Sequence, residues 1–265
     1  MPKANIDRRE FLKLALAGLG SFVALRWLPI PRSFSPPVSP RTNGSSQHSW
    51  AMLIDQDKCN GCGFCVDACR ASNDVHPDIS WNKLYEVDEI AGREIFISIP
   101  CMHCEHAPCV SVCPVKASYY RDDGIVMMDY ERCIGCRYCQ IACPYGARSF
   151  NWETFSGENP AVPEWGEPDV ERRPRGVVEK CTFCYQKIDR GLELGLKPGV
   201  DKIATPACVA TCPTGARVFG DLNDPTSEIN QILAETPSYQ LNEELGTGPR
   251  VYYLSAGRNQ LGENS

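Results

Sequence analysis

Sixteen cysteines dominate the chemistry that this 265-residue chain could perform. They divide into four groups of four with none left over, and in every group the first two cysteines are separated by two residues. Clustered thiolates of this kind are typical ligands of iron or zinc. The groups are Cys59, Cys62, Cys65 and Cys69; Cys101, Cys104, Cys109 and Cys113; Cys133, Cys136, Cys139 and Cys143; and Cys181, Cys184, Cys208 and Cys212.

The spacing within the groups favours iron–sulfur clusters. The first and third groups follow C-x2-C-x2-C-x3-C, the run of bacterial ferredoxins, and a proline follows the last cysteine of the second, third and fourth groups. In that pattern three thiolates bind one cluster and the fourth points to a neighbouring cluster, so clusters occur in pairs. Gly61, Gly63 and Gly135 let the backbone turn tightly and bring its N–H groups close to inorganic sulfide. The sequence therefore predicts four [4Fe–4S] clusters.

Disulfides and zinc are the alternatives. Cysteines that are only two residues apart are poorly placed to bridge one another. Zinc sites use two well-separated Cys-x-x-Cys pairs, whereas a continuous run of three ligands followed by Cys-Pro does not suit one tetrahedral ion. A zinc scaffold without redox activity stays as a hypothesis that metal analysis can decide.

The N-terminal segment predicts where the protein functions. Arg8-Arg9-Glu10-Phe11-Leu12-Lys13 precedes an apolar stretch from Leu14 to Leu25, an order typical of a twin-arginine export signal. The other interpretation is a chance Arg-Arg before an amphipathic helix. The stretch is too short to span a bilayer, which needs about 20 apolar residues. Because this route exports folded proteins, the thiolates could reach the periplasmic, outer face of the cytoplasmic membrane without forming disulfides. No small-x-small cleavage site follows, so the signal could remain as an anchor.

We expect four segments along the chain. Residues 1–28 form the signal or anchor, 29–49 a Pro/Ser-rich tether, 50–256 the cluster-binding domain and 257–265 a polar tail. Residues 1–50 carry a net charge of +5, which leaves −11 for the rest of a chain whose total is −6. Such an acidic domain is a poor binder of nucleic acid.

The pattern predicts an α+β fold with short strands, short helices and long loops. A strand, an Asp, charged residues and a cysteine recur in Ile54–Cys59 and Met128–Cys133, which indicates duplicated and intertwined units of the bacterial ferredoxin type. The inner unit covers about 94–150, and the outer unit combines about 50–80 with 177–256. Strands are expected at 51–54, 94–99, 124–128, 217–219 and 250–254, and helical turns at 66–72 and 140–143.

Three stretches exceed the minimal repeat. Residues 81–93 have the pattern of a hairpin arm that turns at Ala91-Gly92, residues 151–175 are rich in Pro, Glu and Trp, and residues 190–204 separate the second and third cysteines of the last group. They are either surface decoration or docking segments for partner subunits, because long loops often carry function.

Several residues beside the cysteines could modify a cluster without catalysing a reaction. His103 and His106 flank ligands of the second group, where we expect them to donate hydrogen bonds to cluster sulfur or to nearby carbonyls. Lys180 either raises a cluster potential by its charge or is simply solvated. The aromatic neighbours are expected to exclude water rather than to relay electrons; they are Phe64, Tyr138, Phe183 and Tyr185.

The motifs together resemble a known family. They are Cys59–Cys65, Pro100–Cys104 with Ala107-Pro108-Cys109, Cys133–Cys139, Glu179–Cys184 and Cys208–Pro213. Over residues 50–255 the chain is similar to the four-cluster electron-transfer beta subunits of the dimethyl sulfoxide reductase, polysulfide reductase and nitrite-reductase-associated families. The leader and the segments 162–166 and 172–176 resemble, more narrowly, the exported iron–sulfur subunit of the sulfite-reduction-associated menaquinone complex.

The resemblance implies a nested set of ligands. Cys59, Cys62 and Cys65 would share a cluster with Cys212; Cys181, Cys184 and Cys208 with Cys69; Cys101, Cys104 and Cys109 with Cys143; and Cys133, Cys136 and Cys139 with Cys113. All sixteen positions are cysteine, so the resemblance gives no reason to expect a three-iron cluster.

The resemblance also implies a function. The chain would pass electrons, in a membrane-associated respiratory complex, between a polytopic quinone-binding subunit and another redox subunit such as an exported multihaem cytochrome c or a molybdopterin subunit. Sulfite or sulfate reduction is the narrower expectation. The alternatives are a freely diffusing exported ferredoxin and the beta subunit of an exported molybdopterin reductase. The sequence has no Ser/His/Asp arrangement, phosphate-binding glycine loop or nicotinamide fingerprint, so we expect substrate chemistry in another subunit.

Overall fold

The computed structural model describes residues 47–90 and 92–257. The predicted signal at 1–28, most of the tether at 29–49 and most of the polar tail at 257–265 lie outside the described residues. Within the described ranges, no helix combines the length and the apolar character that crossing a membrane requires.

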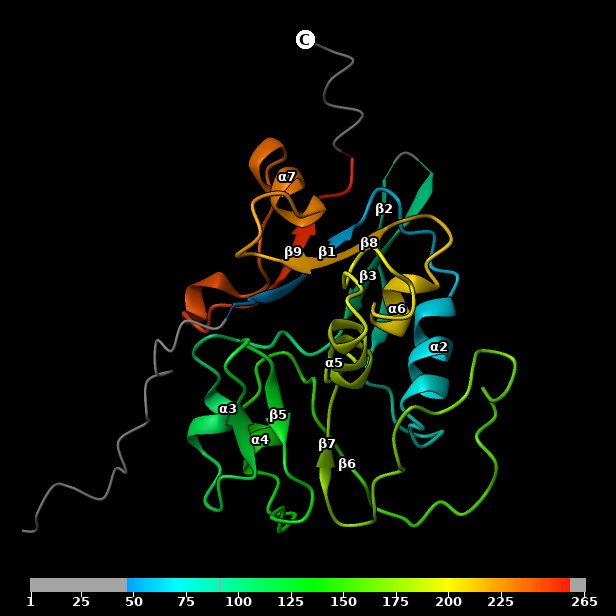
Figure 1. Ribbon diagram of the computed structural model, residues 1–265, viewed down its shortest axis with the longest axis vertical. Helices are drawn as coiled ribbons and strands as arrows, with labels where there is room; N and C mark the ends of the chain where they lie inside the picture. The colour runs from blue at the N-terminus through cyan, green and yellow to red at the C-terminus, as the bar shows by residue number, and fades with distance from the viewer. Residues whose placement is uncertain (1–46, 91, 258–265) are drawn as a thin grey trace, which may run out of the picture. The chain divides into compact units, whose positions relative to one another are not determined.

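A three-stranded sheet brings together the two ends of the described chain (Figure 1). The central strand β1 (Trp50–Asp55) pairs antiparallel with β8 (Arg217–Asp221) and parallel with β9 (Val251–Leu254). Every residue of β1 is buried, as expected for a near-continuous apolar run with both faces covered. Helix α7 (Glu228–Glu235) packs against β8 and β1.

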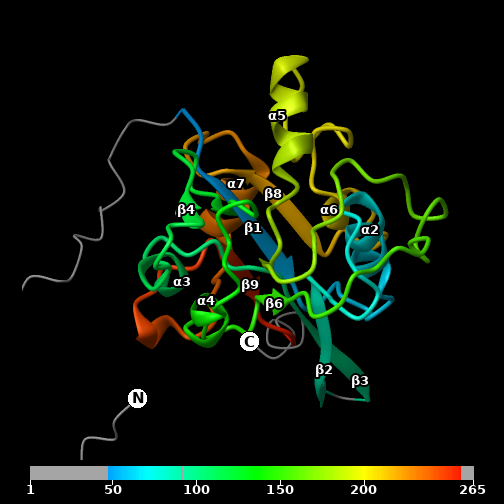
Figure 2. The same cartoon turned by 90° about the horizontal axis from the view of Figure 1, so that it is seen from below.

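The segment after the first cysteine group forms a helix and then an arm. Helix α2 (Phe64–Ser72) packs against the short helix α6 (Ala207–Ala210). Strands β2 (Lys83–Ile90) and β3 (Arg93–Ile99) form the arm, with Ile90 opposite Arg93 and a bulge between Glu86 and Asp88. The predicted hairpin arm is therefore confirmed. It projects on the side opposite to helix α5 (Tyr185–Glu193) in Figure 2.

The second and third cysteine groups lie around smaller elements. Strands β4 (Ser118–Tyr120) and β5 (Val126–Met128) form the hairpin between the two groups, flanked by helices α3 (Pro108–Ser111) and α4 (Tyr138–Ile141). The remaining pair joins distant parts of the chain: β6 (Ser149–Phe150) pairs with β7 (Val178–Glu179). A 3-10 helix, η1 (Glu243–Leu245), precedes β9.

The predicted α+β class and all five predicted strands are confirmed. The expected helix at 66–72 is α2, whereas the turn expected at 140–143 lies two residues earlier as α4. Helices α5 and α7 were not predicted, although Ile229, Ile232 and Leu233 in α7 have the i, i+3, i+4 spacing of a short amphipathic helix. The segment is only eight residues long, too short for its periodicity to stand out.

The largest hydrophobic core contains cysteines from all four groups. Cys69, Cys104, Cys139 and Cys208 belong to it, together with the apolar side chains of β1 and β5. These cysteines are therefore core residues, around which the strands and helices are arranged.

Candidate iron–sulfur cluster sites

Each cysteine group combines a loop with the start of a short helix. Helix α2 carries Cys65 and Cys69, whereas α3, α4 and α6 carry Cys109, Cys139 and Cys208. The first two cysteines of every group precede a helix and lie outside it. Each group therefore combines ligands from a loop with ligands from a helix.

The residue immediately before the second cysteine is left-handed in all four groups. These residues are Gly61 (φ 71°), His103 (φ 44°), Gly135 (φ 69°) and Phe183 (φ 55°). A Cβ on Gly61 would lie 2.5 Å from the Phe96 ring, and one on Gly135 would lie 2.3 Å from the carbonyl oxygen of Gly176. The predicted tight turns are confirmed, and at the two glycines no larger residue fits.

None of the sixteen cysteines forms a disulfide. Eight are buried, six are partly buried, and only Cys62 and Cys136 are exposed. Among residues 47–90 and 92–257, no three His, Cys, Asp or Glu side chains approach closely enough to hold a single metal ion.

Thiols from different groups lie near one another. Burial raises the pKa of Cys69 well above its usual value, and the charges of Cys184, Cys181 and Cys208 raise it further, so the last cysteine of group one lies among those of group four. Cys212 has the same relation to group one: burial raises the pKa of Cys59, and the charges of Cys65 and Cys212 raise it further.

The second and third groups are related in the same way. Burial, followed by the charge of Cys101, raises the pKa of Cys104 to about 12, and Cys109 and Cys143 add to the rise. Burial also raises the pKa of Cys139, near the charges of Cys109 and Cys113. Each of these groups therefore brings its last cysteine close to the thiols of the other.

This donor set fits iron–sulfur clusters. The gathered groups are all soft thiols, which are the ligands of such clusters, and they must lose their protons to bind iron. A cysteine thiol with a raised pKa still loses its proton when it binds an iron ion, because the positive iron stabilises the thiolate. The backbone turns at the four left-handed residues supply the short loops that cluster binding requires.

Three buried cations face these thiols. Arg148 and Arg217 are 2% and 5% exposed, and Lys180 is completely buried, so the alternative of a solvated Lys180 is wrong. The sequence analysis missed both arginines, although each lies in the same motif, Cys-Pro-x-Gly-Ala-Arg-x-Phe, at residues 143–150 and 212–219. This repeated motif could have identified the two arginines from the sequence.

His103 and Phe183 pack against each other between the second and fourth groups, with ring centroids 3.8 Å apart. The Nδ1 atom of His103 accepts a hydrogen bond from the N–H of Val126 at 3.0 Å, while Nε2 makes no hydrogen bond of good geometry. Burial lowers the pKa of His103 well below its usual value, so the ring is neutral with its proton on Nε2. His106, in contrast, is exposed.

The aromatic neighbours behave differently from one another. Phe183 is 1% exposed and excludes water, as predicted. Tyr138 is 60% exposed and Phe64 38% exposed, so neither seals a cluster site within this chain. Phe64 packs against Trp165 of the segment 151–175 instead, with ring centroids 4.7 Å apart.

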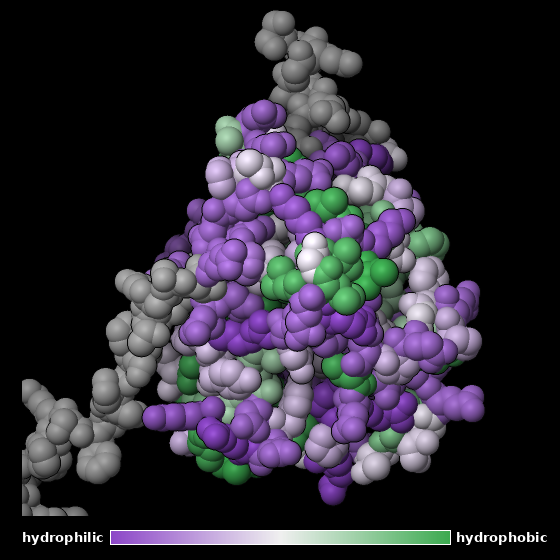
Figure 3. Space-filling model, viewed as in Figure 1, coloured by the Kyte–Doolittle hydropathy of each residue, from purple (hydrophilic) through white to green (hydrophobic). Residues whose placement is uncertain are grey.

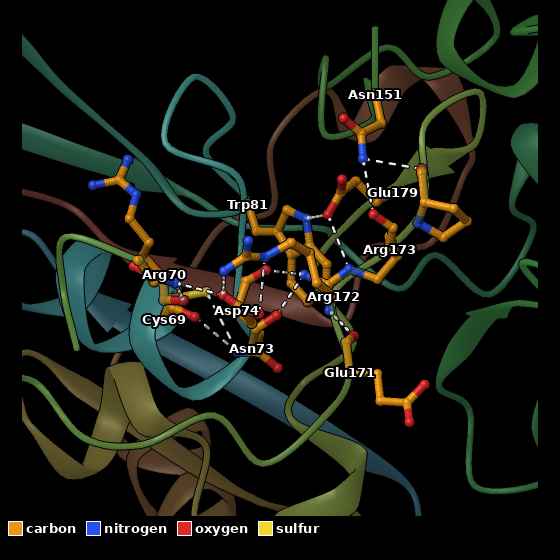
Figure 4. Close-up of polar contacts among 12 residues, drawn as sticks. Cys69, Arg70, Asn73, Asp74, Trp81, Asn151, Glu171, Arg172, Arg173 and Glu179 are labelled. Carbon is orange, nitrogen blue, oxygen red and sulfur yellow. Dashed lines mark hydrogen bonds and ion pairs between the residues drawn. The ribbon is translucent and has the colours of Figure 1, made fainter. Parts of the chain in front are cut away.

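The segment 151–175 is anchored beside the first and fourth groups by ion pairs (Figure 4). Arg172 binds both carboxylate oxygens of Asp74, at 3.0 and 2.9 Å, and Arg173 donates to Glu179 at 3.2 Å. Arg173 also donates to the carbonyl oxygens of Asn73 and Asp74. Since the Asn73 amide donates to the Cys184 sulfur at 3.4 Å, the segment helps to orient a group that contacts a thiol.

Comparison with known proteins identifies the domain type. A family model described as a 4Fe–4S dicluster domain matches residues 93–159, a second model of the same description matches residues 132–216, and a 4Fe–4S binding domain matches residues 50–71. The chain therefore binds several [4Fe–4S] clusters, and its sixteen cysteines match the number of thiolates that four such clusters require.

Relatives cover most of the chain. It is 43% identical to the putative iron–sulfur subunit of a dimethyl sulfoxide reductase of Halobacterium salinarum, over 78% of this chain and 79% of the relative. It is 40% identical to the iron–sulfur cluster-binding subunit of a menaquinone reductase of Nitratidesulfovibrio vulgaris, over 81% and 92%. An iron–sulfur subunit of an Hdr-like menaquinol oxidoreductase of Archaeoglobus fulgidus is 38% identical over 95% and 99%. The chain thus belongs to the family of electron-transferring iron–sulfur subunits of the dimethyl sulfoxide, polysulfide and menaquinone reductases.

Proposed function

We propose that this chain passes electrons through four [4Fe–4S] clusters, in one fixed order, between a quinone-interacting membrane subunit and a second redox subunit of a respiratory complex. The observation that carries the proposal is the mutual position of the thiols, which connects the groups into a single series. The clusters supply one-electron redox chemistry. The chain holds them, excludes water from the inner ones and sets their environment.

The proposed ligands follow the nested pattern. Cluster A is held by Cys59, Cys62, Cys65 and Cys212; cluster B by Cys69, Cys181, Cys184 and Cys208; cluster C by Cys101, Cys104, Cys109 and Cys143; and cluster D by Cys113, Cys133, Cys136 and Cys139. The thiol neighbours described above support these sets. Clusters C and D then belong to the inner ferredoxin-like unit and clusters A and B to the outer unit, which the pairing of β1 with β8 and β9 supports.

Electrostatic effects between the thiols of different sets support the order A, B, C, D. The buried Cys208 of cluster B interacts with the charge of Cys65 of cluster A. Cys181 of cluster B interacts with Cys101 of cluster C. Cys139 of cluster D interacts with Cys109 of cluster C.

Electrons would enter and leave at the ends of this series. The two exposed cysteines, Cys62 and Cys136, belong to clusters A and D, whereas all four ligands of cluster B and three of cluster C are buried. Around Cys136 the side chains of Ile134 and Ile141 are 64% and 82% exposed, an apolar surface that a partner subunit could cover.

A second apolar surface suits a partner within the complex. Figure 3 shows apolar side chains gathered on the face toward which α5 points. In the segment that follows α5, Leu194, Val200 and Ile203 are exposed. Exposed groups of large apolar residues mark protein contacts more often than surface decoration. This supports docking by the insertion 190–204.

The names of the relatives guide the choice of partners. Two of them are subunits of a menaquinone reductase and a menaquinol oxidoreductase, which supports a polytopic quinone-binding membrane subunit as one partner. An exported multihaem cytochrome c or a molybdopterin subunit would be the other, and sulfite or sulfate reduction would be the pathway. The twin-arginine signal at 1–28 would deliver the chain to the outer face of the cytoplasmic membrane.

Paired cysteine variants test the ligand sets. If Cys69 and Cys181 hold one cluster, C69S, C181S and the double variant C69S/C181S each lose the same cluster, about four iron atoms per chain. The matched control C59S/C181S should lose two clusters. Iron analysis of the anaerobically purified variants measures how many clusters each one has lost. A double variant C69S/C181S that loses two clusters while each single variant loses one would contradict the nested sets.

Co-purification tests the assignment to a complex. The chain should elute from gently solubilised membranes with an integral subunit, and haem or molybdenum in that fraction would distinguish the cytochrome partner from the molybdopterin partner. A protein that elutes alone would instead be a freely diffusing exported ferredoxin.

A further inference from the structure

We infer that Arg217, Lys180 and Arg148 lie one at each gap between successive clusters, A–B, B–C and C–D, and that each raises the reduction potentials of the two clusters beside it together. The inference rests on the proposed ligand sets. It makes these residues positioning groups for electron transfer, because none of them is a cluster ligand.

Arg217 occupies the gap between clusters A and B. It begins strand β8 opposite Ile54, and its guanidinium donates to Asn82 Oδ1 at 2.9 Å, to the hydroxyl of Ser98 and to the sulfur of Met52 at 3.4 Å. All three acceptors are neutral. Arg217 lines one pocket together with the four proposed ligands of cluster A, which are Cys59, Cys62, Cys65 and Cys212. Its charge is also affected by Cys208 of cluster B.

Arg148 occupies the equivalent place between clusters C and D. Its guanidinium donates to the sulfur of Cys109 at 3.0 Å, to Ser118 Oγ at 2.6 Å and to the sulfur of Met128 at 2.9 Å. Cys109 and Cys101 belong to cluster C, and Cys139, which also acts on its charge, belongs to D. Both arginines therefore lie against one Met sulfur and one Ser hydroxyl.

Lys180 lies between clusters B and C. Its ammonium donates to the carbonyl oxygens of Val126 and, at 2.8 Å, of Cys181, so two of its three protons have neutral acceptors. The nearby thiols are Cys181 of cluster B and Cys101 and Cys109 of cluster C. The packed rings of His103 and Phe183 lie at the same junction.

None of the three cations pairs with a carboxylate among residues 47–90 and 92–257, whereas Arg121, Arg172 and Arg173 all do. A buried charge without a partner is costly. Clusters ligated by four thiolates are anionic, and each of these cations faces the thiolates of two of them. The clusters are therefore the counter-charges that the protein does not supply.

A cation shared by two clusters affects both in the same direction. A reduced cluster carries one more negative charge than an oxidised cluster, so a nearby cation stabilises it and raises its potential. An electron that passed from one cluster to the next would stay near the same cation, with no bond broken and no proton moved. The cation thus raises both potentials and leaves the difference between them nearly unchanged.

Redox titration followed by electron paramagnetic resonance tests this pairing. After iron analysis has established that each variant holds four clusters, R217Q should lower the potentials of A and B only, K180Q those of B and C only, and R148Q those of C and D only. The cluster signals are assigned with single cysteine variants. R217K keeps the charge and should restore the wild-type potentials. The double variant R121Q/D189N, which removes the ion pair between those two residues without changing net charge, should shift none.

The outcomes separate this inference from the proposed function. A wild-type protein that holds fewer than four clusters would contradict the proposed function. Variants that hold four clusters but shift no potential, or shift all four equally, would overturn the inference alone. Because Arg148 donates to the sulfur of Cys109, a proposed ligand, the R148Q variant could fail to assemble cluster C. Arg217 and Lys180 donate to no ligand sulfur, so the potentials of R217Q and K180Q then test the inference.

Discussion

Buried or half-buried arginines in two regions of this molecule meet two different electrostatic environments. Around the segment 151–175, Arg172 and Arg173 bind the carboxylates of Asp74 and Glu179. Between the cysteine groups, Arg148 and Arg217 bind only neutral oxygen and sulfur atoms and face thiols. In the first region, carboxylates of the polypeptide balance the charges of the arginines. In the second region, only bound anionic clusters would balance them.

The comparison indicates that the polypeptide core depends on its cofactor. Without clusters, the core would contain unpaired cations and protonated thiols such as Cys181, whose pKa burial raises to about 12. Metal binding to such a site contributes directly to folding free energy, because the ligands gather only in the folded state. The outer ion pairs need no metal, so variants in the two regions should fail in different ways.

The largest effect is expected at the buried ion pair of Arg173 and Glu179. R173M leaves Glu179 without its cation and should destabilise the protein by about 3–5 kcal/mol, which lowers the unfolding temperature by on the order of 10 °C. Burial already raises the pKa of Glu179, although the charge of Arg173 opposes the rise. The stability that R173M loses should therefore grow as pH rises and the carboxyl group ionises. The double variant R173M/E179M, which leaves no unpaired charge, is the control. An R173M protein as stable as the wild type would contradict the pairing.

A smaller effect, specific to the loaded protein, is expected at Arg217. R217M removes charge-assisted contacts worth about 1.5–3 kcal/mol, so a chelator should extract iron roughly tenfold faster under anaerobic conditions. The cluster-free polypeptide should not be destabilised, since the substitution removes an uncompensated buried charge. Iron release is followed by the loss of visible absorbance, with R217K as the control. Extraction at the wild-type rate would show that Arg217 does not face a cluster.

The smallest effect is expected at low pH, where the segment 151–175 should lose stability. Burial would raise the pKa of Asp74, but hydrogen bonds from Arg172 and Asn159 outweigh it and lower the pKa; Lys187, Arg190 and Ser72 do the same for Asp169. Both carboxylates therefore stabilise the fold above their ordinary pKa of about 4, and this stability is lost as pH falls through the lowered values.

Limited proteolysis as a function of pH measures this effect. Cleavage within 151–175 should increase below about pH 4, before the central sheet is cut. In the double variant D74N/D169N, cleavage should already be faster at neutral pH and depend less on acid. A segment that stays protected in that variant would contradict the role of these carboxylates.

The cysteine spacing was enough to predict the cofactor, and the strands were predicted because their apolar runs are bounded by turns. The sequence did not reveal that His103 and Phe183 take the left-handed conformation that glycine takes at Gly61 and Gly135, because bulky residues rarely adopt it. Tertiary packing of the two rings stabilises these turns. The buried arginines were equally hidden, because burial of a charge depends on partners distant in sequence.

The most direct test of the account is the amount of iron and acid-labile sulfide in anaerobically purified protein. Four [4Fe–4S] clusters predict about sixteen of each per chain, with absorption that bleaches on reduction. A colourless protein, or one with fewer than about twelve iron atoms, would contradict the central claim that sixteen thiolates hold four clusters in one electron-transfer series.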